Sequence, residues 1–168
     1  MADVEGLSHD ALTLLTEALD ELRESRAREG GRLKGFLLER LAAVEHHVKT
    51  VHAVLPEVVG AFRERLTARL AEISANLDRA RLEQEIVLFA NRTDVAEELD
   101  RLGAHVQEVR RALEGGGQIG RRLDFLMQEF NREANTLGSK SADLRVTNAA
   151  VELKVLIEQM REQVQNIE

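Results

Sequence analysis

The sequence has 168 residues, 43% of them hydrophobic and 32% charged, with a formal net charge of −7. This composition is typical of a helix-rich globular chain and too apolar for intrinsic disorder, and the acidic charge requires any nucleic-acid site to be local. There is no cysteine, which excludes a disulfide scaffold, an iron–sulfur cluster, a cysteine zinc site and thiol catalysis, and weakly favours a reducing cytoplasm.

No apolar run approaches the length needed to span a membrane. The N-terminal stretch "MADVEGLSHD" lacks a basic region followed by an apolar one, so the sequence predicts neither a secretory signal nor a membrane partner.

The N-terminal half carries apolar residues at alternating three- and four-residue steps, the spacing of one helical face. The first run is Leu12, Leu15, Leu19 and Leu22. The second run is Leu37, Leu41, Val44, Val48, Val51 and Leu55. This heptad-like seam predicts a long antiparallel or coiled-coil helix, and the stripe from Leu37 to Val51 is long enough to predict self-association.

Local signals predict where these helices begin and end. Ser8 is the expected N-cap of the first helix, and Gly30–Gly31 weakens its middle. Pro56 suits the first turn of a new helix. The apolar face of that helix comprises Val59, Phe62, Leu66, Leu70, Ile73 and Leu77.

The C-terminal half predicts further helices. A short apolar segment around Ile86 to Phe89 predicts a buried helix. The next helix is capped by Thr93 or Asp94 and ended by Gly115 to Gly117, and another follows as far as Leu137–Gly138. Ser139 or Ser141 is the expected cap of the last one. No segment alternates with the period of a strand, so the chain is predicted to be all-α, with about six helices in an extended hairpin or bundle. Residues 1–78 would form a long helical arm for oligomerisation, and residues 79–168 a C-terminal helical domain with the polar site.

Two of these helices carry polar residues beside the apolar stripe. At roughly 100° per residue, one edge of the helix after residue 93 collects three carboxylates, a guanidinium and an imidazole. These are Asp94, Glu97, Glu98, Arg101 and His105. The following helix is polar opposite its core face, at Asp124, Gln128, Glu129, Arg132, Glu133, Asn135 and Thr136. Arg121 and Arg122 lie at its N-terminus, where backbone N–H groups can also receive an anion.

Two interpretations of these edges stand side by side. The pairs Asp94/Glu98 and Glu129/Glu133 have the i, i+4 spacing by which helical bundles hold Mg²⁺ or Mn²⁺. Such an ion would suit phosphodiester cleavage, with an imidazole binding metal or moving a proton. The alternative is that acids and arginines at this spacing form weak structural ion pairs on solvated helices.

Two C-terminal motifs resemble the YicC/YloC family: "GRRLDFLMQEFNREANTLGSKSADLR" and the closing "VELKVLIEQMREQVQNIE". "RLEQEIVLFANRTDVAEELDRLGAHV" and "RAREGGRL" are also similar to it, and the likeness extends from about Leu7 to the end. The family's D-x-x-E-E-x-x-R-x-x-x-H pattern falls on Asp94 through His105, and its R-E-Q-x-Q-N-x-E pattern begins at Arg161. The resemblance implies a bacterial cytoplasmic, metal-dependent endoribonuclease that assembles into a ring-like homohexamer.

Family members also carry an N-terminal domain that opens with an M-x-x-S-M-T-G-F-G signature, which is not found here. We therefore expect this chain to correspond to the C-terminal portion of a family member. The sequence does not predict whether this portion is active or assembles without the N-terminal domain.

Joining the resemblance to residue chemistry yields a hypothesis for the site. The metal, Mg²⁺ or Mn²⁺, would be held by Asp94, Glu98, Glu129 and Glu133. His105 would shuttle the proton, and with Glu98, Glu129 and Glu133 it makes up the predicted catalytic set. RNA would be bound by Arg101, Arg121, Arg132, Asn135 and Lys140.

This hypothesis requires the helices on either side of Gly115–Ile119 to be antiparallel neighbours. Two other functions remain open on the sequence: a helical oligomerisation scaffold, and an RNA-binding module without catalysis.

Overall fold

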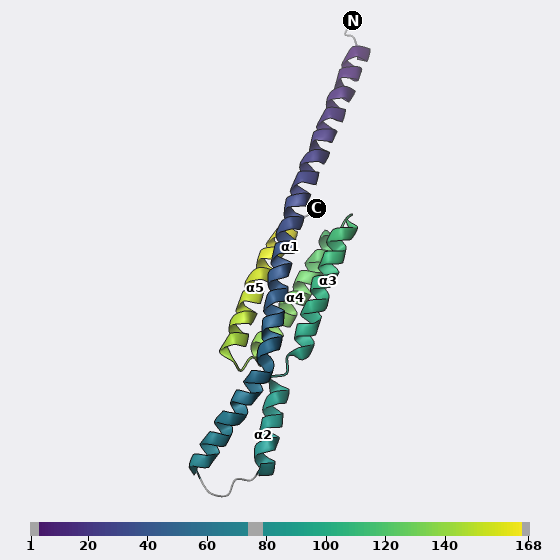
Figure 1. Cartoon of the computed structure of the whole chain (residues 1–168). Coiled ribbons are helices and arrows are strands. Elements are labelled where there is room, and N and C mark those ends of the chain that lie inside the picture. Colours follow the sequence, from purple (N-terminus) through teal and green to yellow (C-terminus); the bar gives the residue numbers. More distant parts are fainter. Residues whose placement is uncertain (1–3, 74–78, 166–168) are drawn as a thin grey trace. The chain divides into compact units, whose positions relative to one another are not determined.

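The computed structural model describes the backbone of residues 4–73 and 79–165. Over these residues it contains helices and no strand: α1 (Val4–Ile73), α2 (Arg79–Arg92), α3 (Ala96–Gly115), α4 (Gly120–Lys140) and α5 (Leu144–Val164) (Figure 1). The predicted all-α class is confirmed. The described residues hold five helices where about six were expected, because α1 continues through positions that were predicted to divide it. None of the described helices is long and apolar enough to cross a membrane.

The chain packs as two units, Met1–Leu38 and Glu39–Glu168. In the first unit the described residues belong to the N-terminal part of α1. Its leucine seam is open to solvent: the exposed fractions are 64% for Leu12, 56% for Leu15, 48% for Leu19 and 53% for Leu22. The predicted division after residue 78 concerns the roles of the two parts, and it stays a prediction.

In the second unit, the continuing seam of α1 is covered by the unit's own helices. Leu41, Val44, Val48 and Val51 are each less than 8% exposed. The ion pair of Glu45 with Arg110 on α3, at 3.3 Å, shows that α3 is one of the neighbours. The argument that this stripe requires self-association is therefore wrong for these four residues, because the chain buries them itself.

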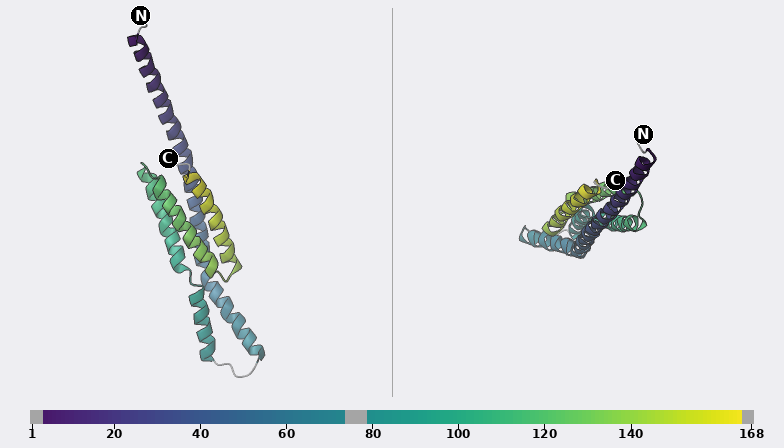
Figure 2. Two further views of the ribbon diagram at one scale, coloured as in Figure 1. Left: turned by 180° about the vertical axis from the view of Figure 1, so that it is seen from behind. Right: turned by 90° about the horizontal axis from the view of Figure 1, so that it is seen from above.

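Two predicted boundaries of α1 are also wrong. The helix begins at Val4, so Ser8 is not its cap, and Pro56 lies inside the helix. A proline inside a helix removes one backbone hydrogen bond and favours a kink. On either side of Pro56, Val51 and Val58 are buried at 1% and 7% exposure, so side-chain packing offsets that local cost. Figure 2 shows that α1 changes direction in its C-terminal part.

Helix α2 lies beside the C-terminal part of α1. The rings of Phe62 and Phe89 stack with centroids 3.7 Å apart, and Arg63 pairs with Glu83 at 2.6 Å. An aromatic contact and an ion pair thus join the two helices.

The prediction that the α2 segment is thoroughly buried is wrong. Ile86 is buried, but Val87 and Leu88 are exposed, because only one side of α2 meets α1. Leu77, the last member of the apolar face expected after Pro56, lies outside the described residues.

Helices α3, α4 and α5 follow one another as antiparallel neighbours (Figures 1 and 2). The chain leaves α3 through Gly116 and Gly117, whose φ angles of 65° and 80° favour glycine. The core between these helices is closed, and the following side chains are 0% exposed: Leu102, Val106, Met127, Phe130, Leu153 and Ile157.

An aspartate lies at the start of both α3 and α5, but only the one at α5 is the N-cap. The N-cap of α3 is Val95, which has no capping side-chain hydrogen bond, so the prediction of Thr93 or Asp94 as that cap is wrong. From the position before that cap, the Asp94 carboxylate accepts a hydrogen bond from the Ala96 N–H at 3.0 Å. Asp143 caps α5 by accepting from the Arg145 N–H at 2.8 Å. The prediction of Ser139 or Ser141 as that cap is wrong. Ser139 lies within α4, and the Ser141 hydroxyl is 2.7 Å from that of Thr147, which links the loop to α5.

Candidate functional site

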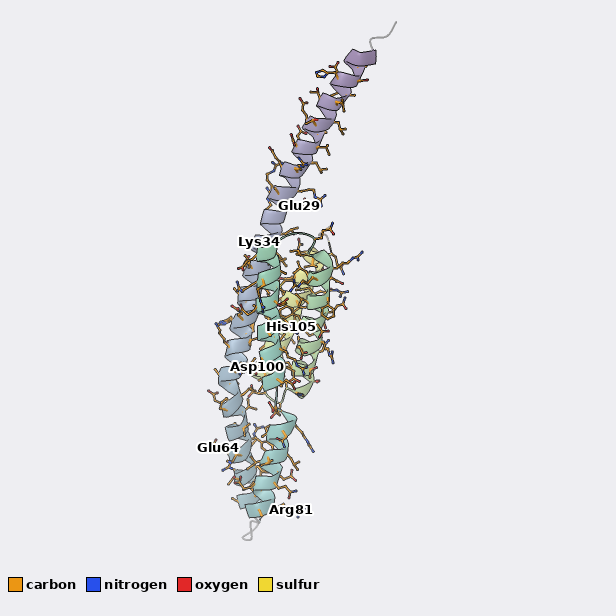
Figure 3. The ribbon with its side chains drawn as sticks, turned by 90° about the vertical axis from the view of Figure 1, so that its right-hand side faces the viewer. Glu29, Lys34, Glu64, Arg81, Asp100 and His105 are labelled. Atoms are coloured by element: carbon orange, nitrogen blue, oxygen red, sulfur yellow. The ribbon has the colours of Figure 1, made fainter. Side chains whose placement is uncertain are left out.

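The packing of α3 against α4 brings together three groups of the predicted site. One ligand atom each from His105 on α3 and from Glu129 and Glu133 on α4 lie within 4.8 Å of one another. Figure 3 labels His105 on α3. The two glutamates are one helical turn apart, so both reach the same side of α4. We call these three residues the His–Glu cluster.

The imidazole of His105 is held by the core beneath it. Its ring meets the edge of the buried Phe130 ring at a centroid distance of 5.6 Å and an interplanar angle of 63°. Its Nε2 atom is buried and has no hydrogen-bond partner among the described residues. A buried polar atom without a partner costs free energy. Nε2 is therefore the atom of the cluster whose bonding requirement is left open for a ligand or a proton.

Arg101 compensates part of the acidic charge of the cluster. Glu133 is only 3% exposed, and its Oε1 accepts a hydrogen bond from Nη1 of Arg101 at 3.3 Å. The same guanidinium also binds Glu97, one turn earlier on α3. The hydrogen bonds to Glu133 and Glu97 raise the pKa of Arg101, which therefore stays charged. Glu129, by contrast, has Arg132 at 3.9 Å, beyond hydrogen-bond distance.

Asp94 and Glu98 lie apart from the His–Glu cluster. Glu98 is 6% exposed and accepts a hydrogen bond from Nζ of Lys140 at 2.8 Å. Lys140 also donates to the backbone oxygen of Asp94 at 3.0 Å. Glu98 precedes His105 by seven residues, or about 10 Å along the helix axis. The structure thus divides the four predicted metal ligands into two pairs, one of which is engaged with Lys140 and with the first N–H of α3.

The predicted RNA-binding residues are distributed in a similar way. Arg101 contacts the cluster and Arg132 lies near it, while Lys140, the last residue of α4, is engaged with Glu98. Arg121 is exposed in the first turn of α4, eight residues and about 12 Å from Glu129 along the axis. A single phosphate group is too small to contact all of these cations.

Two residues near the candidate site have roles that were not predicted from the sequence. Phe130 was given no part in the predicted site, although its buried ring supports His105. Arg161 was placed in the closing motif without a role, yet it lines a groove between α4 and α5. The available signal was its position as the first residue of that motif; only helix packing shows what it faces.

Comparison with known proteins identifies the family. Residues 51–168 match the family described as endoribonuclease YicC-like, C-terminal. The chain is 49% identical over 166 residues to the probable endoribonuclease YicC of Haemophilus influenzae, covering 99% of this chain and 58% of that protein. It is 38% identical over 155 residues to the probable endoribonuclease YicC of Clostridioides difficile, covering 90% of this chain and 53% of that protein. The chain thus spans just over half the length of these relatives, and it belongs to the YicC-like endoribonuclease family, whose C-terminal region it contains.

Proposed function

We propose that this chain supplies the catalytic helical region of a metal-dependent endoribonuclease and that the His–Glu cluster is its reaction site. The observation that carries the proposal is the convergence of His105, Glu129 and Glu133 within 4.8 Å across two helices. The relatives are named probable endoribonucleases, which supports RNA as the substrate. Asp94 and Glu98 then act as structural residues at the start of α3.

The cluster has the chemistry to hold a divalent cation. Carboxylate oxygens are the protein ligands that Mg²⁺ and Mn²⁺ prefer, and Glu129 and Glu133 would supply them. The unpartnered Nε2 of His105 agrees with a site that is completed by a further group. When bound, such an ion lowers the pKa of a hydroxyl or water and stabilises charge that develops on the phosphate.

The chain's own residues would perform the remaining steps. His105 would accept the proton of the attacking hydroxyl and return it to the leaving oxygen. Arg101 orients Glu133 through their hydrogen bond and is a positioning residue. Arg132 and Asn135 would contact the RNA backbone beside the cluster.

A cleavage assay on a 5′-labelled structured RNA, with Mn²⁺ or with EDTA, tests the proposal. His105→Gln and Glu129→Gln should each slow cleavage by about a hundredfold or more, which is the usual contribution of a positioned acid–base group. Glu114→Gln is the matched control, since Glu114 is an exposed carboxylate on α3.

Cleavage that persists in EDTA, or that falls equally in the control, would contradict the proposal. RNA binding without any cleavage would support the alternative of a binding module.

We further propose that the chain self-associates through the leucine seam of the first unit, because Leu12, Leu15, Leu19 and Leu22 are 48–64% exposed. Leu15→Glu should reduce the sedimentation coefficient at tens of micromolar, a usual working range for a surface of this kind. Leu14→Glu is the control, since Leu14 is equally exposed, at 65%, but lies about 160° from Leu12 around the helix. A wild-type chain that sediments as a strict monomer would contradict this proposal.

A further inference from the structure

A groove of about 510 Å³, lined mainly by residues with polar side chains, runs between α4 and α5. It opens on a different face of α4 from the one that packs against α3. Met127, which is fully buried, lies at its base. The polar lining residues are Gln128, Asn131, Arg132, Asn135 and Thr136 from α4 and Arg161 from α5.

The charge of this groove is opposite to that of the whole chain. Its lining contains two guanidinium groups and no carboxylate, although the net charge of the chain is −7. The nearest acidic partners lie outside the lining. Glu129 is 3.9 Å from Arg132, and Glu158 is 3.6 Å from Arg161. Both distances exceed those of hydrogen bonds, so each acid forms only a long ion pair with its arginine and accepts no hydrogen bond from it.

Arg161 carries an unmet hydrogen-bonding requirement. Its Nε atom is buried and has no acceptor among the described residues, while 41% of its side chain is exposed. A guanidinium binds a phosphate best with two parallel N–H groups. A small rotation of Arg161 toward an anion in the groove would satisfy Nε and one terminal nitrogen together.

The amides of the groove provide further donors. Asn135 donates to the side-chain oxygen of Asn131 at 2.6 Å, which holds both amides in place. Each primary amide has two N–H donors. No hydrogen bond from the Asn131 nitrogen is found in the described part of the chain. Pre-positioned amides and two arginines form a surface suited to successive phosphate and sugar oxygens.

We propose that this α4–α5 groove binds the phosphodiester backbone of a single RNA strand, as a second contact beyond the reaction site. The identity of the strand as RNA rests on the proposed function. Arg132 links the two sites, since it lines the groove and lies 3.9 Å from Glu129 of the His–Glu cluster. A strand held in the groove would therefore pass directly beside the cluster.

The test measures binding of fluorescent single-stranded RNA of twelve nucleotides, in EDTA, as a function of salt. Arg161→Gln and Arg132→Gln should each weaken binding about tenfold at low salt. Each should also reduce the slope of log K against log salt by about 0.7, the value for one phosphate contact on a single strand. Arg161→Lys should retain the slope, because it keeps the charge, but bind less tightly than wild type.

Arg111→Gln is the matched control. Arg111 also pairs with an acid three residues away, at 3.4 Å from Glu108, but it lies outside the groove. Equal losses in this control and in Arg161→Gln would overturn the proposal. Thermal melting, followed by circular dichroism, identifies variants that are unfolded. The double charge reversal Arg161→Glu with Arg132→Glu is a second variant in which RNA binding by the groove is measured.

Inorganic phosphate and oligomers of three to twelve nucleotides distinguish a strand from a free anion. Affinity that rises with length supports the strand, whereas phosphate that binds as tightly as the longest oligomer overturns it. The variant His105→Gln separates this proposal from the proposed function. If His105→Gln still binds RNA through the groove, the groove is supported, even if the wild-type chain with Mn²⁺ cleaves no RNA. If His105→Gln loses this RNA binding, the groove is not a separate contact and the proposal is contradicted.

Discussion

Two acidic pairs with the same spacing have different surroundings in this protein. Asp94 and Glu98 at the start of α3, and Glu129 and Glu133 in the middle of α4, are each one turn apart. Glu98 is bound by Lys140 at 2.8 Å, and Asp94 accepts a hydrogen bond from the first N–H of α3. The second pair meets His105, whose Nε2 lacks a partner among the described residues. Spacing places two carboxylates on one face, but the packing of α3 against α4 decides what each one meets: Glu98 meets Lys140, whereas Glu133 meets His105 and Arg101.

The largest expected effect comes from removing the cation of the compensated pair. Lys140→Met leaves Glu98 buried without its partner, and should lower the free energy of unfolding by about 2 kcal/mol. The value is below that of a fully buried pair, because Lys140 is 37% exposed. Urea unfolding measures it. The double variant Glu98→Leu with Lys140→Met should recover most of the loss, and a double variant as unstable as the sum of both single changes would contradict this account.

Removing Arg101 should increase the affinity of the Glu129/Glu133 pair for a cation. In Arg101→Gln, Glu133 loses the positive charge that now compensates it, so a bound cation meets less repulsion. Binding of Mn²⁺, measured by calorimetry, should tighten by an energy on the order of 1 kcal/mol. Arg111→Gln should leave the affinity unchanged. Weaker Mn²⁺ binding in Arg101→Gln would show that Arg101 does not compete with the ion for Glu133.

Asp143, the N-cap of α5, is an acid paired with Arg145, and the effect of its charge on stability can be measured by changing the pH. The hydrogen bond from the Arg145 side chain lowers the pKa of Asp143 below its ordinary value of 3.8. Its contribution to stability is therefore complete above that value and is lost as the pH falls through the lower folded-state pKa. Asp143→Asn keeps a cap and should remove this part of the acid dependence.

Asp143→Ala should also lower the free energy of unfolding by about 1 kcal/mol at neutral pH, because it removes the cap itself. Thermal unfolding between pH 2 and 7 measures both effects. An Asn variant with the acid profile of wild type would contradict the role of the Asp143 charge.

Asp94→Asn should have the smallest effect. Asparagine can accept the same hydrogen bond from the Ala96 N–H, so stability should change by less than about 0.5 kcal/mol. The response to Mn²⁺ should also stay as in wild type, because Asp94 lies outside the His–Glu cluster. Loss of the response to Mn²⁺ in Asp94→Asn would show that Asp94 is part of the metal site.

The fold was largely predictable from the sequence, because helical periodicity and glycine signals act locally. The end of α3 at Gly115 and the neighbouring helix α4 follow from such signals. The sequence did not predict which elements cover each apolar face. The leucines from Leu12 to Leu22 and the seam from Leu41 to Val51 share one spacing, yet the first run is exposed and the second is buried. Pro56 shows a related limit, because packing on both sides overrides its local preference to begin a helix.

The site was predictable only as two polar faces. Residues His105, Glu129 and Glu133 were identified from spacing and family resemblance, but their separation from Glu98 depends on how α3 lies against α4. The reach of Lys140 from the end of α4 back to Glu98 spans 42 positions in the sequence. No local pattern contains that contact.

Metal-dependent stabilisation tests the central claim most directly. If Glu129 and Glu133 hold a divalent cation, Mn²⁺ at a hundred times its dissociation constant should stabilise the folded chain by about 2.7 kcal/mol. Differential scanning calorimetry should show this as a higher melting temperature in wild type and in Asp94→Asn. Glu129→Gln should lose most of that gain while its metal-free form stays at least as stable as wild type. A wild-type melting temperature that Mn²⁺ leaves unchanged, or an equal rise in Glu129→Gln, would contradict the assignment of the His–Glu cluster as a metal site.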